Sequence, residues 1–292
     1  MLNKDTKDWL NTFREEDDIF KKLDHKCVTI SVTAGKGGVG KTSAALKWSL
    51  LLAEQGKKVL LIDCDFNLSN TTIKLGLPLN DNFVDLISGR KSFSSCLYKK
   101  GNLSLLSGCN GSIDLLEKGS MLESFITEVI SHHKHKFDVV ILDCPAGISS
   151  TTLILGAYCD HRFIIVTPDK SSITDSYSLI KIMKTKYGIT ENHLIVNKVE
   201  SKQQYKKVVR TISETVENYL SCRTVILGGV KKYEGNIESF DQMLLAEKNS
   251  IFHKNFLKIL DRFSEQDGGD LQERTILGAT LAGPSRHEVL AE

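Results

Sequence analysis

A glycine-rich octapeptide near the start of the chain, Gly35–Thr42, constrains the fold more than any other stretch. Its letters, GKGGVGKT, satisfy the phosphate-loop pattern G-x-x-x-x-G-K-[ST]. A β-branched run over Cys27–Thr33 precedes it, and a segment of helical composition follows at Ser43–Leu51. Because strand, glycine loop and helix is the context in which this pattern binds phosphates, the sequence predicts a nucleoside-triphosphate site rather than a glycine-rich turn without a ligand.

The residue types in the loop suit a polyphosphate. Glycines lack the Cβ atoms that would hold backbone N–H groups away from the ligand, and the start of a helix adds partial positive charge. Lys41 is expected to reach the β- and γ-phosphates, and the Thr42 hydroxyl to coordinate Mg²⁺. The phosphate-binding residues predicted from the loop are Gly35, Lys36, Gly37, Gly38, Val39, Gly40, Lys41, Thr42 and Ser43.

Acidic residues end two other predicted buried strands. Lys57–Asp65 ends in Asp63 and Asp65, which alternate and so share one side of a strand, and Phe137–Asp143 is an apolar strand of Walker B type. Beside a phosphate loop, such acids hold Mg²⁺ or orient an attacking water. Acids at strand ends also form turns, which is the alternative interpretation.

Strand and helix patterns alternate along most of the chain, which predicts an α/β fold. We expect a doubly wound, mainly parallel sheet with helices on both faces and the site at the carboxyl ends of the strands. Three parts are predicted: an N-terminal helical extension over residues 1–25, a nucleotide-binding domain over 26–263, and a flexible tail over 264–292. The segment from 237 to 263 is expected to be helical, and the helix after Asp169 to be capped by serine and threonine.

Composition narrows the functional classes. With 41% hydrophobic and 25% charged residues, the 292-residue chain is not of a disordered or fibrous class. A formal net charge of +2, without one long basic run, gives no strong signal for nucleic-acid binding. Seven cysteines without a C-x-x-C pair, no membrane-spanning run and no signal-peptide pattern predict a cytoplasmic protein.

Lys36 makes the loop more specific. The run Lys36–Thr42 resembles the K-G-G-x-G-K-T loop of the MinD/ParA family of ATPases, in which the first lysine reaches the partner's nucleotide across a dimer interface. Asp63–Asn70 resembles the D-x-D-x-x-x-x-N segment of MinD-type proteins, and Asp143–Ile148 their D-x-P-A-G-I switch segment. The resemblance implies ATP and Mg²⁺ as ligands and a homodimer that forms on ATP binding.

The same resemblance assigns roles to individual residues. Lys36, Lys41 and Asp65 are the implied catalytic residues, with Asp65 positioning the hydrolytic water. Thr42, Asp63 and Asp143 are the implied metal-site residues. Asn197 follows a predicted strand, has an amide suited to an adenine edge, and matches a family asparagine that contacts adenine.

One run points to a branch of the family. Thr167–Met183, TPDKSSITDSYSLIKIM, resembles the T-P-E-x-x-S-I-T-D-A-Y-x-L-I-K segment of FlhG-type proteins, which control flagellar number and placement. Members of this branch carry an N-terminal helix that stimulates the GTPase FlhF. Asp8–Arg14 keeps the acid, the apolar spacing and the arginine of that helix but lacks its Gln-Ala pair. The resemblance implies slow, partner-stimulated hydrolysis, with an FlhF-like GTPase or a flagellar regulator as partner.

Several alternatives stay open. The N-terminal segment either packs back on the domain or binds a partner. The amphipathic stretch over residues 252–263 either docks its phenylalanines on the sheet or lies on an anionic membrane, which would make the protein peripheral to the inner face of the cell membrane. His132, His133 and His135 are expected in a solvated loop rather than in a metal site. The rival functions are a chromosome- or plasmid-partitioning or division-site ATPase, and a nucleotide-gated scaffold with little hydrolysis.

Overall fold

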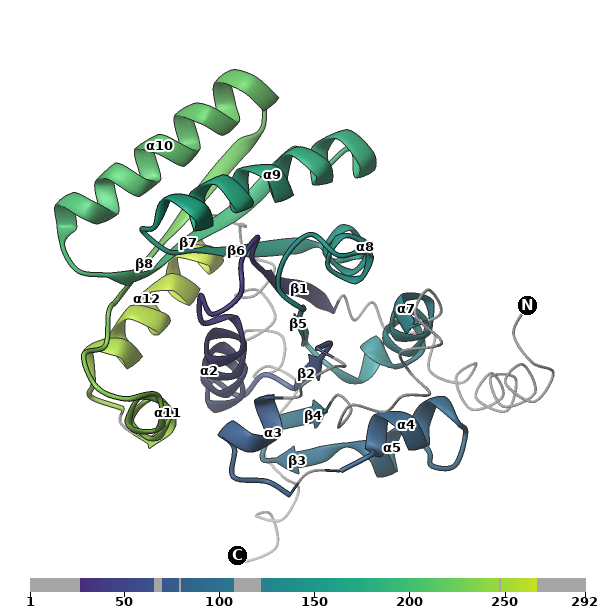
Figure 1. The fold of residues 1–292 in the computed structure, drawn as a ribbon. Helices are drawn as coiled ribbons and strands as arrows, with labels where there is room; N and C mark the ends of the chain where they lie inside the picture. Colours follow the sequence, from purple (N-terminus) through teal and green to yellow (C-terminus); the bar gives the residue numbers. More distant parts are fainter. Residues whose placement is uncertain (1–26, 66–69, 79, 108–121, 247, 267–292) are drawn as a thin grey trace, which may run out of the picture.

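A computed structural model describes residues 27–65, 70–78, 80–107, 122–246 and 248–266 (Figure 1). Within these residues the strands form one sheet in the order β3-β4-β2-β5-β1-β6-β7-β8. The strands are β1 (Val28–Thr33), β2 (Val59–Asp63), β3 (Tyr98–Lys100), β4 (Leu103–Leu106), β5 (Val139–Asp143), β6 (His161–Val166), β7 (Glu191–Val199) and β8 (Arg223–Lys231). The helices are α2 (Lys41–Glu54), α3 (Asn70–Lys74), α4 (Asn82–Ile87), α5 (Phe93–Cys96), α7 (Leu122–His133), the 3-10 turn η2 (Lys134–Lys136), α8 (Ser150–Tyr158), α9 (Lys170–Tyr187), α10 (Lys202–Leu220), α11 (Ile237–Ala246) and α12 (Ile251–Gln266).

The predicted fold class is confirmed. All neighbouring strands pair in parallel except β3 and β4, a short antiparallel pair that the sequence did not indicate. Alternate residues of β6 face opposite layers: Phe163 and Ile165 pack with α2 and α12, whereas Ile164 and Val166 pack toward α9 and α10. Helices therefore cover both faces of the sheet (Figure 1), and the carboxyl ends of β1, β2 and β5 meet at one edge.

The apolar face of α12 belongs to the core. Phe256 and Phe263 are 2% and 1% exposed, and the Phe256 ring meets Trp48 of α2 edge-on at 5.5 Å between centroids. The docking interpretation of residues 252–263 is confirmed for this structure, so the same face is not free for a membrane. Among the described residues, no helix is long and apolar enough to cross a membrane.

The segment from 237 to 263, expected to be helical, contains two helices separated by a short break. Helix α11 ends at Ala246 and α12 begins at Ile251, with the Ser250 hydroxyl accepting the His253 N–H. Serine is a favoured N-cap, so it starts a second helix there. The break lets α11 pack on α2 independently of α12, which runs along β8.

Two further predictions need correction. Helix α9 is capped by Asp169, whose carboxylate accepts the Ser172 N–H, because the acid stands at the N-cap position ahead of the serines. His133 is buried and stacked on Phe93, and burial lowers the pKa of its imidazole to about 3. It is thus a core residue rather than part of a solvated loop, and in the described ranges no group of three or more His, Cys, Asp or Glu side chains is arranged to hold a metal ion.

Some predictions lie outside the described residues. They concern the N-terminal extension with Asp8–Arg14, residues 66–69 of the acidic segment, Cys109, and residues 267–292 of the predicted tail; residues 264–266, which the sequence predicts as part of that tail, belong to α12. The other six cysteines are buried and form no disulfide among the described residues, as expected for small apolar side chains in a core.

Replacing Phe256 with alanine tests the role of α12. We expect Phe256→Ala to lower the free energy of unfolding by roughly 3–5 kcal/mol, because it opens a cavity beside Trp48. Lys254→Ala, an exposed position on the same helix, should change it by less than about 0.5 kcal/mol. Urea denaturation measures both. Equal, small effects would mean that the α12 face is not packed in the core.

Candidate nucleotide site

The glycine loop connects β1 to α2 and leaves the start of that helix bare. Gly38 and Gly40 adopt φ values of 71° and 98°, which L side chains rarely take. Gly40 is the N-cap of α2 and provides no side-chain cap, whereas α8, α9 and α10 are capped by side chains. The first N–H groups of α2 are therefore available to an anionic ligand.

Lys41 lies at the base of this helix terminus. It is 8% exposed, and burial lowers the pKa of its ammonium, an effect opposed by the carboxylates of Asp143 and Asp65. A buried cation is costly unless it is paired. A polyphosphate held on the loop would supply the missing negative charge.

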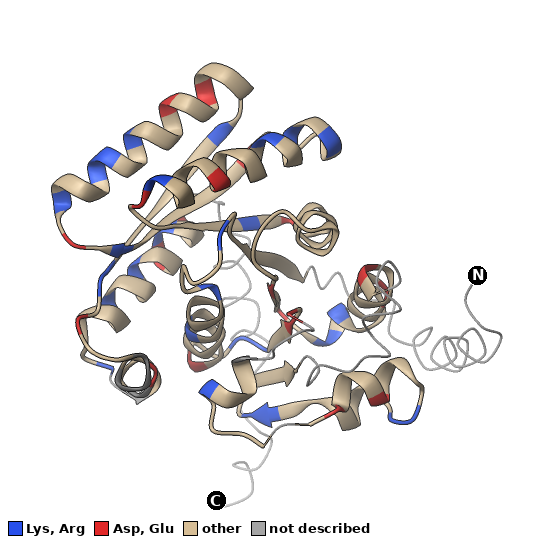
Figure 2. Cartoon of the chain, in the orientation of Figure 1, with Lys and Arg blue, Asp and Glu red and all other residues tan. Residues whose placement is uncertain are grey.

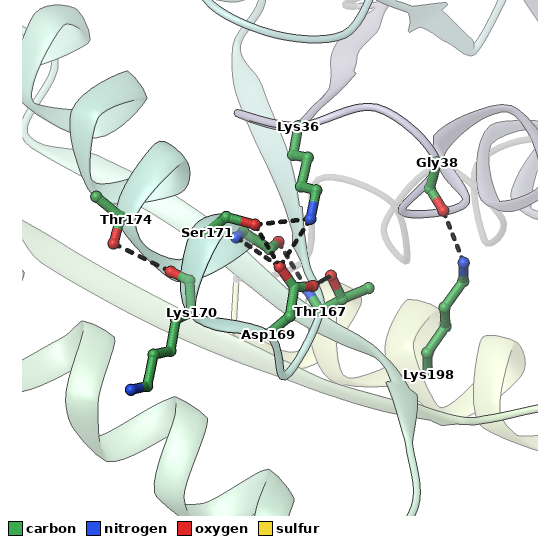
Figure 3. Close-up of polar contacts among 9 residues, drawn as sticks. Lys36, Gly38, Thr167, Asp169, Lys170, Ser171, Thr174 and Lys198 are labelled. Carbon is green, nitrogen blue, oxygen red and sulfur yellow. Dashed lines mark hydrogen bonds and ion pairs between the residues drawn. The ribbon is translucent and has the colours of Figure 1, made fainter.

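Two consecutive residues after β7 hold the loop from outside. Asn197 Nδ2 donates to the carbonyl of Val39 at 2.7 Å, and Lys198 Nζ donates to the carbonyl of Gly38 at 2.7 Å (Figure 3). Lys198 takes a left-handed conformation, with φ of 57°. Both side chains donate hydrogen bonds to carbonyl groups of the loop. They therefore favour a loop conformation whose N–H groups point away from Asn197 and Lys198, toward a ligand. No sequence pattern had pointed to Lys198.

Asn197 was predicted to contact adenine. The structure places it beside the phosphate loop, where its amide nitrogen lies 2.5 Å from the position that a Cβ on Gly40 would occupy. Its Nδ2 is bonded to the loop and its Oδ1 accepts the Lys198 N–H. Contact with a base stays a prediction.

The two buried acids of the site stand side by side. Asp63 and Asp143 pair across β2 and β5, and each is 1% exposed. The Asp63 carboxylate accepts the N–H groups of Asp65 and Thr71, as a turn-forming acid does. Burial followed by the charge of Asp63 raises the pKa of the Asp143 carboxyl to about 8, and the nearby Thr42 hydroxyl and Lys41 ammonium oppose this rise.

These acids suit a divalent cation. Two buried carboxylates side by side repel each other and are poorly solvated, and a hard cation with oxygen ligands would relieve this cost. Asp143, with Asp63 and the Thr42 hydroxyl, would hold Mg²⁺ directly or through water. The bound cation would neutralise phosphate charge there.

A cavity of about 670 Å³ opens in front of the loop and gathers most of the predicted residues. Gly37, Gly38, Gly40, Lys41, Thr42, Ser43, Asp65 and Asn197 line it, together with Tyr233 and Phe240, which sequence patterns did not single out. Its volume is in the range of small-ligand sites. Of the two acids on alternate residues, Asp65 faces the cavity, and Asp63 is buried behind it.

Lys36 lies elsewhere. It lines a neighbouring cavity of about 390 Å³, where its ammonium bonds the Asp169 carboxylate at 2.9 Å and the Ser171 hydroxyl at 2.7 Å (Figure 3). Hydrogen bonds from Thr167 and then from Lys36 and Ser171 lower the pKa of the Asp169 carboxyl well below its usual range. Asp169, the N-cap of α9, thus also holds Lys36 at the rim of the main cavity.

The predicted switch segment adjoins the loop. Ala146 lines the main cavity, and Gly147, with φ of 85°, donates its N–H to the carbonyl of Ala34. Ser149 then caps α8. A change in the loop can therefore reach α8 through a few backbone contacts.

A bare helix terminus behind a glycine loop, a buried lysine and a pair of strand-end acids define a phosphate-loop nucleotide-binding protein. Comparison with known proteins narrows this class, because residues 27–214 match the AAA_31 family, described as an AAA domain. The chain belongs to this family, and within it to the MinD/ParA group of ATPases.

Known relatives and solved structures support this family assignment. The chain is 31% identical over 249 residues to the septum site-determining protein MinD of Synechocystis, covering 82% of this chain and 90% of the relative. It is 27% identical to the antiactivator FleN of Pseudomonas aeruginosa, covering 70% and 73%, and 29% identical to the flagellum site-determining protein YlxH of Helicobacter pylori, covering 66% and 65%. MinD of Pyrococcus horikoshii, solved with Mg-ADP, shares the fold with a TM-score of 0.68 at 21% identity, over 85% of this chain and 100% of that one.

Gly35 offers a test of the loop that needs no ligand. A Cβ at Gly35 would lie 2.3 Å from the backbone carbonyl carbon of Asp175, whereas one at Gly37 would meet only Ala146 Cβ, at 3.8 Å. We expect Gly35→Ala to lower the free energy of unfolding by roughly 1–3 kcal/mol, and Gly37→Ala to leave it within about 1 kcal/mol. Thermal unfolding without nucleotide measures both. Equal stability of the two variants would contradict the close packing of the loop on α9.

Proposed function

We propose that this protein is a Mg²⁺-dependent ATPase that dimerises on ATP binding and returns to monomers after hydrolysis. The observation that carries the proposal is the position of Lys36. It belongs to the loop but does not line the loop's own cavity; it stands on the rim, 42% exposed at its side chain. In the proposed dimer, a cation at this position would act on the nucleotide held by the second copy.

The remaining roles follow from the cavity. Lys41 and the N–H groups of α2 would bind the phosphates and offset charge that develops during transfer. Asp65, half-buried and facing the cavity, would orient the attacking water. Thr42, Asp63 and Asp143 would hold the cation, and Asn197 would contact the base once nucleotide displaces its bond to Val39.

Assembly of the dimer requires Lys36 to leave its present partners. Its ion pair with Asp169 is partly exposed at both side chains, and exposed pairs contribute on the order of 0–1 kcal/mol. Such a contact holds the lysine in place yet exchanges readily for a phosphate. Slow turnover fits a protein that works through its conformational states.

For the cellular role we propose control of flagellar number or placement. The Thr167–Met183 run and the similarity to the flagellum site-determining protein YlxH support it. An FlhF-like GTPase or a flagellar regulator would act through the N-terminal segment, and the protein would work in the cytoplasm. A division-site role is the second candidate, favoured by the 31% identity to a septum site-determining protein.

Size-exclusion chromatography tests the switch. Asp65→Ala should lose at least about tenfold in hydrolysis rate while still binding ATP, since the residue orients water rather than phosphate. With Mg-ATP this variant should elute as a dimer, and with ADP as a monomer. Hydrolysis at the parent rate would remove Asp65 from the mechanism.

The matched control carries a second change. Adding Lys36→Ala to Asp65→Ala should abolish the ATP-dependent dimer while leaving nucleotide affinity within about threefold, because Lys36 lies outside the cavity. A double variant that still dimerises with ATP would contradict the role of Lys36, and the lack of any ATP-dependent dimer in Asp65→Ala would contradict the switch itself.

A further inference from the structure

A second cavity, of about 550 Å³, lies along the outer edge of the sheet and is separate from the phosphate loop. Strand β8 is the last strand of the sheet, and α10 and α12 pack against it. Because α12 covers one face of the sheet and α10 the other, the cavity lies between the two helices along the free edge of the strand. We call it the β8 groove; its walls include Lys202 and Tyr205 of α10 and Asn255, Lys258 and Arg262 of α12.

Two glycines let both helices approach the strand closely. A Cβ at Gly228 would lie 3.1 Å from Ile259 of α12, and one at Gly229 would lie 2.9 Å from the Tyr205 ring of α10. Side chains larger than hydrogen would push the helices apart. The close approach makes a narrow groove with main chain in its floor.

In the floor of the groove, the edge of β8 presents backbone N–H and C=O groups. Side chains of α12 bond two of its groups: Arg262 donates to the carbonyl of Ile226 at 3.3 Å, and Asn255 Oδ1 accepts the Lys231 N–H at 3.3 Å. Gly228 and Gly229 lie between these two points. The edge is thus bonded by α12 side chains at both ends, and the register of β8 against β7 shifts between Ile226 and Gly228. The glycine main chain between these ends is the stretch beside which an extended segment would pair.

The groove is strongly basic. Lys202, Lys231, Lys258 and Arg262 contribute four cations to its lining, and Figure 2 shows lysine and arginine along α10 and at the end of β8. The one acid in the lining, Glu200, is paired with Lys232. Within the part of the chain that the structure describes, no carboxylate forms an ion pair with the four cations. The field in the groove therefore favours an anionic occupant.

We propose that the β8 groove binds an extended acidic segment of a partner protein, which adds to the sheet beside β8. Main-chain hydrogen bonds to the strand edge would align the segment, and acidic side chains would meet cations from both walls. A polyanion such as duplex DNA needs only the charge, whereas the glycine main chain between the two bonded ends of the strand edge suits a peptide backbone. The site is independent of ATP hydrolysis, although Lys231 lines both this groove and the main cavity.

A synthetic peptide tests the proposal on the full-length protein. The probe is a fluorescein-labelled decapeptide of alternating glutamate and valine, followed by fluorescence anisotropy. The groove variant is Lys202→Glu with Lys258→Glu, one exposed residue from each wall. The matched control is Lys207→Glu with Lys254→Glu, exposed on the same helices but outside the groove. Both variants change net charge equally.

We expect the peptide to bind, with affinity for the groove variant lower by at least roughly tenfold and affinity for the control variant lower by no more than about threefold. A peptide of the same sequence with alternate backbone amides N-methylated should bind at least about tenfold more weakly, because methylation removes strand pairing. Thermal unfolding and nucleotide binding should match the parent in both variants.

Three results would overturn the proposal: no binding of the peptide to the parent protein, equal loss in groove and control variants, or undiminished binding of the N-methylated peptide. Duplex DNA and vesicles of phosphatidylglycerol are the competing occupants. If either binds in a way that depends on Lys202 and Lys258 while the peptide does not, the groove recognises that polyanion and the strand-addition account is wrong.

Discussion

The structure depends on the left-handed backbone of the phosphate loop and on the buried ammonium of Lys41 next to it. Gly38 and Gly40 turn the loop so that its carbonyls face Asn197 and Lys198 while α2 starts without a side-chain cap. Lys41 is buried at the same point and lacks a full complement of negative charge. The uncapped N-terminus of α2 and the buried ammonium of Lys41 would both be stabilised by a negatively charged ligand, and a polyphosphate can contact both.

The surrounding elements transmit the state of the loop to the rest of the molecule. The pairing of β2 with β5 sets Asp63 beside Asp143, and the backbone of Gly147 ties the segment after β5 to the end of β1. On the other flank, Asp169 caps α9 and binds Lys36 with the same carboxylate. A nucleotide that draws Lys36 away would therefore alter the start of α9, which connects the site to an outer helix.

The sequence predicted the features that depend on a few consecutive residues. The loop, the buried strands and the acids at their ends are patterns of a few residues, and they lie where the patterns put them. Contacts across the chain could not be read: Lys36 and Asp169 are 133 residues apart, and Lys198 reaches the loop through a left-handed backbone that lysine rarely adopts. The binding partner of the apolar face of α12 was ambiguous, because an apolar stripe on a helix can pack on a sheet or bind a membrane. The β8 groove depends on which strand forms the edge of the sheet, and that is a property of topology.

Mixing two inactive variants tests whether Lys36 acts on the partner's nucleotide. Lys36→Ala keeps Asp65, and Asp65→Ala keeps Lys36; in a mixed dimer the site of the first chain would receive the lysine of the second. If Lys36 acts in this way, an equimolar mixture will hydrolyse ATP clearly faster than the sum of the two variants measured alone. A rate equal to that sum would exclude this role, since Lys36 would then serve only its own nucleotide.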